Sequence, residues 1–498
     1  MNGKAKYNVA IAYTDKKYYP KVPPFFPSEK YPEYIFSEDI SDENSVYDQV
    51  RTSFYLLGMD AEKFGTCEWN PLKDLISPGN TVLIKPNLVM DHNPSGDGTD
   101  CLFTHPSVVK PVIDYVIIAL NGYGKIVIGD APMQECDFNN LINTSGYKTL
   151  IDYYKNNTKC KGISFELIDF RDVTSTISSG GVYHSSLKDK SGGCIVKLNE
   201  ISEFSNLKES LISKLRVTNY DPAILQEHHN SFTHEYCINW NVLSADVIIN
   251  MPKPKTHRKA GVTISLKNLV GINARKEFLP HHTNGSKEEG GDEYNADSII
   301  KSAKSHLLDI RNVFMQRYKF YFPAKAINSV LTVLNVIQRH TKCDSYFEGS
   351  WYGNKTISRT IADLNKILLY ADKSGVIQKN IQRSYFIVAD MIISGENEGP
   401  VMPTAKNVGI IASGYNPVCF DEMILTIMGA KINMIDTITV ARSTQNDEYR
   451  LVEKGEMPFA VSNDPRWDNK SIDDITDNDK LYFEPTSGWI PAFYKRER

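Results

Sequence analysis

The sequence lacks closely spaced cysteines. Its eight cysteines are scattered over 498 residues, with no pair separated by two residues and no short run of the kind that holds iron–sulfur clusters. This absence argues against a resident cluster. The first residues also lack the apolar segment of a signal peptide, so we expect a cytoplasmic protein with reduced thiols.

Long apolar runs are missing as well. No uninterrupted run reaches the ~18 residues that a membrane-spanning helix needs, so we expect no membrane span. The nearest approach is residues 318–337, where apolar residues are interrupted by Lys319, Pro323, Lys325 and Asn328. Here we expect a buried helix beginning near Pro323 rather than a helix on a membrane surface.

The chain has no strong excess of positive charge. Its formal net charge is -4, which gives no global attraction to nucleic acid. Any anion binding must therefore be local. The glycine patterns of dinucleotide sites and P-loops and the G-x-S-x-G nucleophile motif are also absent, which disfavours those three classes of enzyme.

Short apolar runs alternate with helical periods along most of the chain. Strand followed by helix followed by strand is typical of βαβ units with a right-handed crossover, which build parallel sheets. We therefore predict an α/β fold with a mostly parallel sheet, flanking helices and an inserted helical region. The expected strands are 7–13, 81–85, 125–130, 163–168, 245–250, 385–390 and 406–412, and the expected helices are 46–57, 106–120, 139–154, 296–317, 359–370 and 417–429.

The pattern predicts three parts. Residues 1–276 together with 384–446 form the α/β core. Residues 277–383 begin with a polar, glycine-containing loop and continue as a mainly helical insertion or lid. Residues 447–498 are a C-terminal extension that packs on the core, with Trp467 and Trp489 as expected anchors.

Four apolar runs end on a polar group. These groups are Lys85, Asp130, Asn250 (which leads to Lys253) and Asp390. Ligands of parallel α/β sheets bind beyond the carboxyl ends of the strands, so we expect the four groups to share one pocket. The alternative for each one alone is a strand end that meets solvent.

The basic stretch at residues 250–271 is the most site-like part of the sequence. Prolines on either side of Lys253 restrict the backbone, so less entropy is lost when the side chains are held in place. Ammonium groups in a partly dry cleft bind anions strongly. We expect a small phosphorylated or carboxylated metabolite as substrate, bound by Lys85, Asn87, Lys253, Thr263 and Asn268.

The catalytic candidates are His257, Lys255, Lys267 and Asp130. We expect His257 to act as an acid, a base or a substrate hydrogen-bond donor, while metal ligation and a structural role stay as alternatives. A lysine in a cationic cluster has a reason for a depressed pKa, which suits either proton abstraction or Schiff-base chemistry.

The carboxylates Asp390 and Glu396 suggest a divalent cation such as Mg²⁺ or Mn²⁺. They could equally neutralise the lysines, and the sequence leaves this open. The paired histidines at 228–229 and 281–282 lack the spacing of a zinc-binding helix, so we expect loop histidines there.

Seven of these motifs occur in an order and spacing that resemble the bacterial and archaeal family known as domain of unknown function 362. Some members of that family carry a ferredoxin-like iron–sulfur segment, so the resemblance implies redox or metallocofactor handling as a second function, and a noncatalytic anion-binding module is a third. This chain lacks the cysteine run, and residues 277–383 lie outside the shared pattern. The motifs lie at residues 82–89, 104–106, 129–132, 250–257, 263–271, 390–400 and 416–421.

Overall fold

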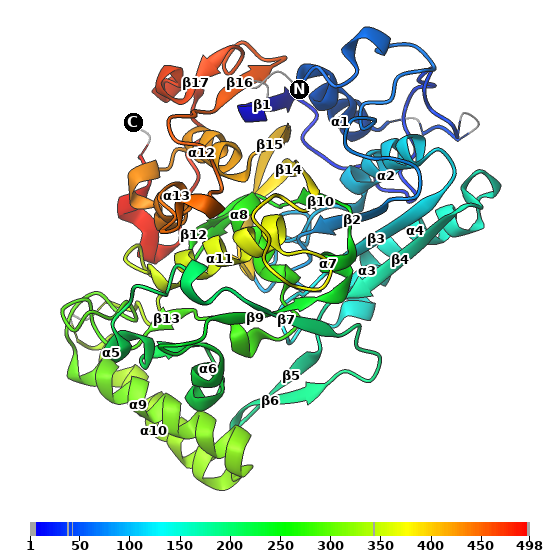
Figure 1. Ribbon diagram of the computed structural model, residues 1–498. Coiled ribbons are helices and arrows are strands. Elements are labelled where there is room, and N and C mark those ends of the chain that lie inside the picture. The colour runs from blue at the N-terminus through cyan, green and yellow to red at the C-terminus, as the bar shows by residue number, and fades with distance from the viewer. Residues whose placement is uncertain (1–5, 37–38, 42, 342–343, 496–498) are drawn as a thin grey trace.

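The centre of the molecule is one large twisted sheet. The computed structural model describes residues 6–36, 39–41, 43–341 and 344–495. Five neighbouring strands of the sheet run parallel (Figure 1), which confirms the predicted α/β class with a mostly parallel sheet. In spatial order they are β14 (Ser384–Glu398), β10 (Val247–Met251), β2 (Thr81–Pro86), β3 (Gly124–Asp130) and β4 (Ile163–Asp169).

The sheet continues beyond β14 with a mixed edge. Strand β15 (Met402–Gly414) is antiparallel to β14, and β1 (Asn8–Tyr13) is antiparallel to β15. Two strands of the C-terminal segment complete this edge, β16 (Phe459–Ser462) and β17 (Lys470–Ser471). Trp467 and Trp489 are fully buried, as expected for anchors of this segment.

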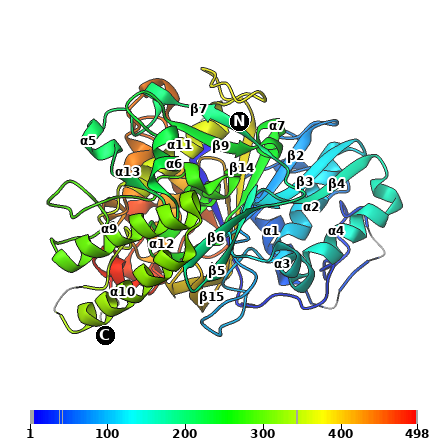
Figure 2. The ribbon, with the colours of Figure 1, turned by 90° about the horizontal axis from the view of Figure 1, so that it is seen from below.

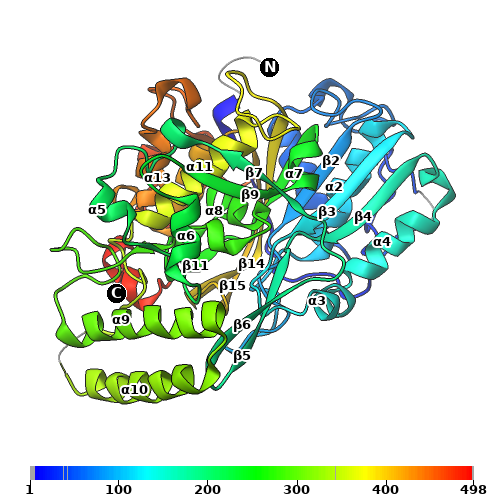
Figure 3. The same cartoon turned by 60° about the horizontal axis from the view of Figure 1, so that its bottom comes forward.

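Each face of the sheet is covered by its own helices, seen from two further directions in Figures 2 and 3. Side chains alternate between the faces, so that Val82 and Ile84 enter one apolar cluster and Leu83 enters the other. The first cluster contains α1 (Ser45–Leu56), α2 (Pro106–Leu120), α3 (Phe138–Ser145) and α4 (Tyr147–Asn156). Against the second lie α7 (Trp240–Ser244), α8 (Ser265–Asn268), α11 (Thr356–Tyr370), α12 (Pro417–Met428) and α13 (Asp436–Arg442).

Helix boundaries follow local chemistry. Helix α2 begins at Pro106 and continues through Pro111, with His105 as its N-cap. The helix expected at 139–154 is instead two helices, because Gly146 between them adopts a φ of 93° that ends α3.

The segment between β4 and β10 carries short strands and helices that lie below the main sheet in Figure 1. Two of its strand pairs are antiparallel: β5 and β6 form a hairpin, whereas β7 and β9 are separated in sequence by residues 198–234. After β10 the basic stretch forms a further hairpin from β11 and β12. The bounds are β5 (Val173–Ser178), β6 (Gly181–Ser186), β7 (Gly193–Lys197), α5 (Glu209–Ile212), β8 (Leu215–Arg216), α6 (Pro222–His228), β9 (Glu235–Asn239), β11 (Lys255–His257), β12 (Gly261–Thr263) and β13 (His282–Thr283).

Residues 277–383 contain three long helices with different environments. Helices α9 (Ile299–Val313) and α10 (Tyr321–Arg339) form an outer hairpin joined through a π-helical turn at Phe314–Tyr318, whereas α11 is buried along its whole length in the core. The expectation of a buried helix from Pro323 is wrong. Only the α9 side of α10 is covered, and the opposite side faces solvent. No helix within the described residues is both long and apolar enough to cross a bilayer.

Candidate functional site

A cavity of about 260 Å³ opens at the carboxyl ends of the parallel strands. Its wall includes Asp130 at the end of β3 and residues of the β11–β12 hairpin, where Lys255 lies directly opposite Thr263 in the register. Helix α8 supplies Lys267 and Asn268. The structure therefore gathers most of the expected site residues around one space.

Helix α8 is held in place by a carboxylate from another part of the chain. Asp421 on α12 accepts hydrogen bonds from the backbone N–H groups of Ser265 at 2.9 Å and Leu266 at 3.0 Å. Burial raises the pKa of this carboxyl group to about 7. These bonds fix the start of this single-turn helix, so that its last two residues, Lys267 and Asn268, face the cavity.

Lys85 and Asp130 form an ion pair beneath the cavity floor. Their Nζ and Oδ1 atoms are 2.7 Å apart, and the Lys85 side chain is fully buried. Asp130 also accepts from the backbone N–H groups of Leu88 at 2.7 Å and Ala131 at 2.9 Å. With its acceptors engaged in this way, Asp130 is suited to positioning rather than to proton transfer. Lys85, expected to bind substrate, lies behind the cavity lining.

Three asparagines connect this ion pair to the cavity. Asn268 Oδ1 accepts from Lys85 Nζ at 3.2 Å and from Asn87 Nδ2 at 3.0 Å, while Asn268 Nδ2 donates to Asn250 Oδ1 at 2.7 Å. Asn87 Oδ1 in turn accepts from Lys255 Nζ at 2.8 Å. One continuous hydrogen-bonded chain thus orients groups from four separate sequence motifs.

Gly271 allows this arrangement to be compact. A Cβ atom built on Gly271 would overlap the carboxylate of Asp130 and lie 2.8 Å from Lys85 Nζ. The Gly271 carbonyl accepts from the Ala131 N–H at 2.9 Å. The backbone therefore approaches the ion pair as closely as it does because residue 271 has no side chain.

Four lysines line the cavity, and burial lowers the pKa of each. The pKa falls to about 7 for Lys255 and Lys267 and to about 8 for Lys259 and Lys276, and nearby cations add to the effect in each case. The Lys259 ammonium donates to Thr218 Oγ1 at 2.7 Å. The Lys267 and Lys276 ammonium groups make no hydrogen bond or ion pair with any residue that the structure describes.

Two of the three histidines that line the cavity have opposite proton arrangements. His257 Nδ1 accepts from the backbone N–H groups of Lys259 at 3.0 Å and Ala260 at 3.1 Å, so a neutral His257 carries its proton on Nε2. His281 Nδ1 donates to the Leu279 carbonyl at 2.6 Å, which leaves its Nε2 as an acceptor. Burial lowers the pKa of both imidazoles well below the usual value, and neighbouring lysines lower it further. These two neutral imidazoles therefore offer the cavity one hydrogen-bond donor and one acceptor.

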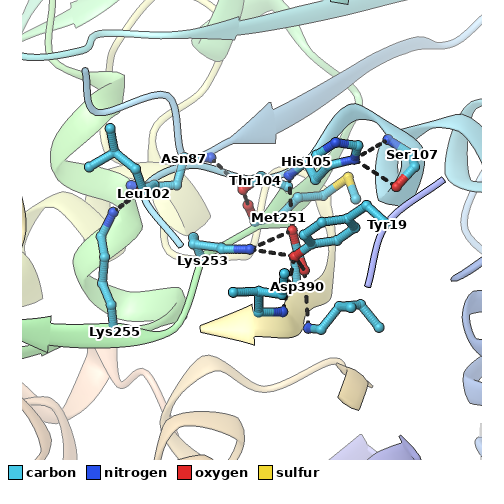
Figure 4. A network of polar contacts seen from close by, with 12 residues as sticks. Tyr19, Asn87, Leu102, Thr104, His105, Ser107, Met251, Lys253, Lys255 and Asp390 are labelled. Atoms are coloured by element: carbon cyan, nitrogen blue, oxygen red, sulfur yellow. Dashed lines mark hydrogen bonds and ion pairs between the residues drawn. The ribbon is translucent and has the colours of Figure 1, made fainter. Parts of the chain in front are cut away.

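Lys253 interacts with Asp390 and Tyr19 (Figure 4), and Tyr19 belongs to the apolar cluster on the other face of the sheet. Its Nζ lies 3.0 Å from Asp390 Oδ2 and 2.6 Å from the hydroxyl of Tyr19, and that hydroxyl donates to Asp390 Oδ1 at 2.6 Å. The ring of Tyr19 stacks on His105 at 4.1 Å. Side chains alternate along β14, so Asp390 shares the face of Phe386 and points away from the cavity.

The structure does not bring Asp390 and Glu396 together. They lie six residues apart on β14, and Glu396 Oε2 pairs with Lys406 Nζ at 2.8 Å. Each carboxylate thus has its own lysine. Within the described parts of the chain no group of three or more histidine, cysteine or acidic side chains is arranged to hold a metal ion.

Several lining residues were missed from the sequence. Lys276 and His281 follow the basic motif closely in sequence. Because Lys276 comes only five residues after Gly271, the sequence could have indicated that Lys276 belongs to the site. His184 and Tyr220 stack on each other at 4.1 Å and form a less polar wall. Nothing in the sequence around these two residues indicates that they meet.

A family model confirms the resemblance noted in the sequence. The model for "Domain of unknown function (DUF362)" matches residues 82–164 and 170–426, so the chain belongs to this family. The second matched range runs through residues 277–383, which the motif comparison had left outside the shared pattern. No curated protein matches the chain. The family's description assigns no activity, so function has to be argued from the site.

Proposed function

We propose that this protein is an enzyme that acts on a small phosphorylated or carboxylated metabolite in the cavity. The proposal rests on one observation: the ammonium groups of Lys267 and Lys276 line the cavity without a partner among the described side chains. Partly buried cations without a counterion are costly, and an anionic ligand supplies the missing charge.

The charge balance of the lining supports an anionic ligand. Four lysines and Arg258 face the cavity. Opposite them are the carboxylates of Glu135 and Glu348, while Asp130 is already neutralised by Lys85. In a cavity of low effective dielectric the surplus positive charge attracts an anion far more strongly than it would in bulk water.

Proton transfer is the chemistry that these groups support best. A lysine with a pKa of about 7, as for Lys255 and Lys267, is partly deprotonated at neutral pH and can take or give a proton. The Nε2–H of His257 can donate a hydrogen bond to an oxygen of the substrate. A neutral lysine could also attack a carbonyl group, so a ketone or aldehyde substrate would permit Schiff-base chemistry.

The proposed setting is the cytoplasm. The cysteines that the structure describes are all free thiols, which fits a reducing compartment.

The test begins with thermal shift against a panel of phosphorylated and carboxylated metabolites, because a ligand that binds only the folded state raises its melting temperature. Stabilising ligands are then incubated with the protein, and products are sought by mass spectrometry. We expect turnover that Lys255→Ala and His257→Ala abolish. Stabilisation without product identifies a noncatalytic anion-binding module, and unchanged turnover in both variants removes these residues from the mechanism.

A further inference from the structure

The outer face of α10 is an apolar surface that no described residue covers. Phe322 and Val333 are 84% and 57% exposed, and they belong to a stripe with the three- and four-residue spacing of one helix face. The opposite side of the helix, with Ala324 and Leu331, packs toward α9. We call the exposed side the α10 face. Its stripe consists of Phe322, Ala326, Val330, Val333 and Ile337.

Aromatic side chains enlarge the α10 face at its N-terminal end. Tyr318, Phe320 and Tyr321 are each about half exposed, and the rings of Tyr318 and Phe320 stack with their centroids 5.9 Å apart. Aromatic rings with one apolar and one polar side are favoured where hydrocarbon meets water. A cluster of this size on the outermost helix is unusual for a surface that meets only water.

The segment of chain that carries the α10 face has charged side chains of one sign. From residue 310 to residue 341 the chain contains five arginines and lysines and neither aspartate nor glutamate. Lys319, Lys325 and Arg339 make no ion pair with any described residue. The protein as a whole is slightly acidic, with a net charge of -4, so the charge of this segment is opposite in sign to that of the whole protein.

We propose that the α10 face docks onto an anionic lipid bilayer, with its apolar stripe in the headgroup region and its basic side chains on lipid phosphates and carboxylates. An apolar face on a helix whose charged side chains are all basic is the pattern of helices that lie in a membrane surface. A second copy of the chain is disfavoured as occupant, because two such faces would bring like charges together. The helix is also a projecting rod rather than a groove, which suits a flat surface (Figure 3).

Docking would place the cavity wall next to the bilayer. Tyr321 at the start of α10 packs against Tyr183 of β6 at 4.9 Å, and the neighbouring Val182 and His184 line the cavity. From the preceding helix, Arg311 Nη2 donates to the side chain of the lining residue Asn219 at 3.0 Å. The docking surface and the site are therefore in direct contact through these side chains, although the docking proposal does not depend on any particular reaction.

Sedimentation of the full-length protein with vesicles tests the proposal. We expect binding to vesicles that contain phosphatidylserine in phosphatidylcholine, weaker binding as salt is added, and little binding to phosphatidylcholine alone. Val333→Ser/Ile337→Ser should lower the partition coefficient by about tenfold or more, since apolar contact contributes to binding. Lys325→Glu/Arg339→Glu should abolish the preference for phosphatidylserine. The control is Phe232→Ser, which replaces an exposed apolar ring that is not part of α10 and should bind like the wild type.

Three results would overturn the proposal: no binding of the wild type to phosphatidylserine vesicles at low salt, equal binding by Val333→Ser/Ile337→Ser, or a dimer in solution that the same double variant dissociates. All substituted side chains are exposed, and an unchanged melting temperature confirms that each variant is folded.

Discussion

The ammonium group of Lys255 lies 2.8 Å from the side-chain oxygen of Asn87, so its partner is a neutral amide. Its other acceptor is the carbonyl oxygen of Leu102, which is also neutral. Lys255 is thereby oriented without being neutralised. In contrast, Lys85 nearby is paired with a carboxylate. Lys255 therefore faces the cavity with a charge that no carboxylate balances, whereas Lys85 has a structural role beneath the cavity floor.

Replacing Lys267 should remove anion binding and make the protein more stable. Lys267→Met keeps the length of the side chain but removes a partly buried charge that has no partner among the described residues. We expect loss of the ligand-induced thermal shift together with a gain of about 1 kcal/mol in unfolding free energy. The control is Lys379→Met at a solvent-exposed site, which should change neither quantity. A Lys267→Met protein that binds the anion like the wild type would contradict the assignment.

Anion affinity should fall as the pH rises above about 7. Burial lowers the pKa of Lys255 and Lys267 to about 7 in the free protein, and a bound anion favours the charged form and raises both values. Anion affinity is therefore highest below about pH 7, where both lysines are charged before the anion binds. Above it, affinity decreases by up to about tenfold per pH unit for each lysine that deprotonates. Calorimetric titrations across this range measure the slope, and a flat profile would show that these lysines do not contact the ligand.

Much of the fold could be predicted from sequence, because the spacing of apolar residues differs between strands and helices and is visible within a short segment. The strands at 81–86 and 124–130 and the helix from Pro106 to Leu120 needed only apolar spacing and turn residues. Exposure of α10 could not be predicted in this way. Apolar spacing shows that a helix has an apolar face, but it does not show which face a partner covers.

The site was predictable for part of its lining, which includes Asn87 and Asp130 from the ends of two predicted strands. Lys255, Lys267 and Asn268 come from one continuous stretch and do meet at the cavity. Asp390 does not join them because side chains alternate between the two faces of a strand, which places Asp390 on the same face as Phe386. The apolar run around Phe386 could have indicated this face from the sequence. Tyr220 reaches the cavity through tertiary packing alone, for which a single sequence gives no measure.

The Lys85 and Asp130 pair should be necessary for stability. Lys85→Met leaves the Asp130 carboxylate buried without its cation, and we expect a loss of roughly 3–5 kcal/mol in unfolding free energy. The double variant Lys85→Met/Asp130→Asn removes both charges and should recover part of this loss. Urea unfolding of the three proteins gives the comparison. If Lys85→Met unfolds at the wild-type urea concentration, the ion pair does not hold the cavity floor.

Two substitutions at His257 should separate its structural role from its chemical role. In His257→Asn the amide oxygen can accept the backbone N–H groups of Lys259 and Ala260 in place of Nδ1, but the Nε2–H is lost. We expect a melting temperature close to that of the wild type and a loss of turnover of about a hundredfold or more. His257→Ala should lose turnover and also about 1 kcal/mol of stability. Full turnover by the asparagine variant would restrict His257 to holding the hairpin.

The most direct measurement is an electron-density map of the protein crystallised with tungstate, a phosphate analogue whose anomalous scattering locates it without ambiguity. We expect a strong anomalous peak inside the cavity, within hydrogen-bonding distance of Lys267 and Lys276, and no such peak in crystals of Lys267→Met. Peaks confined to surface lysines, with none in the cavity, would contradict the claim that these unpaired cations form an anion site.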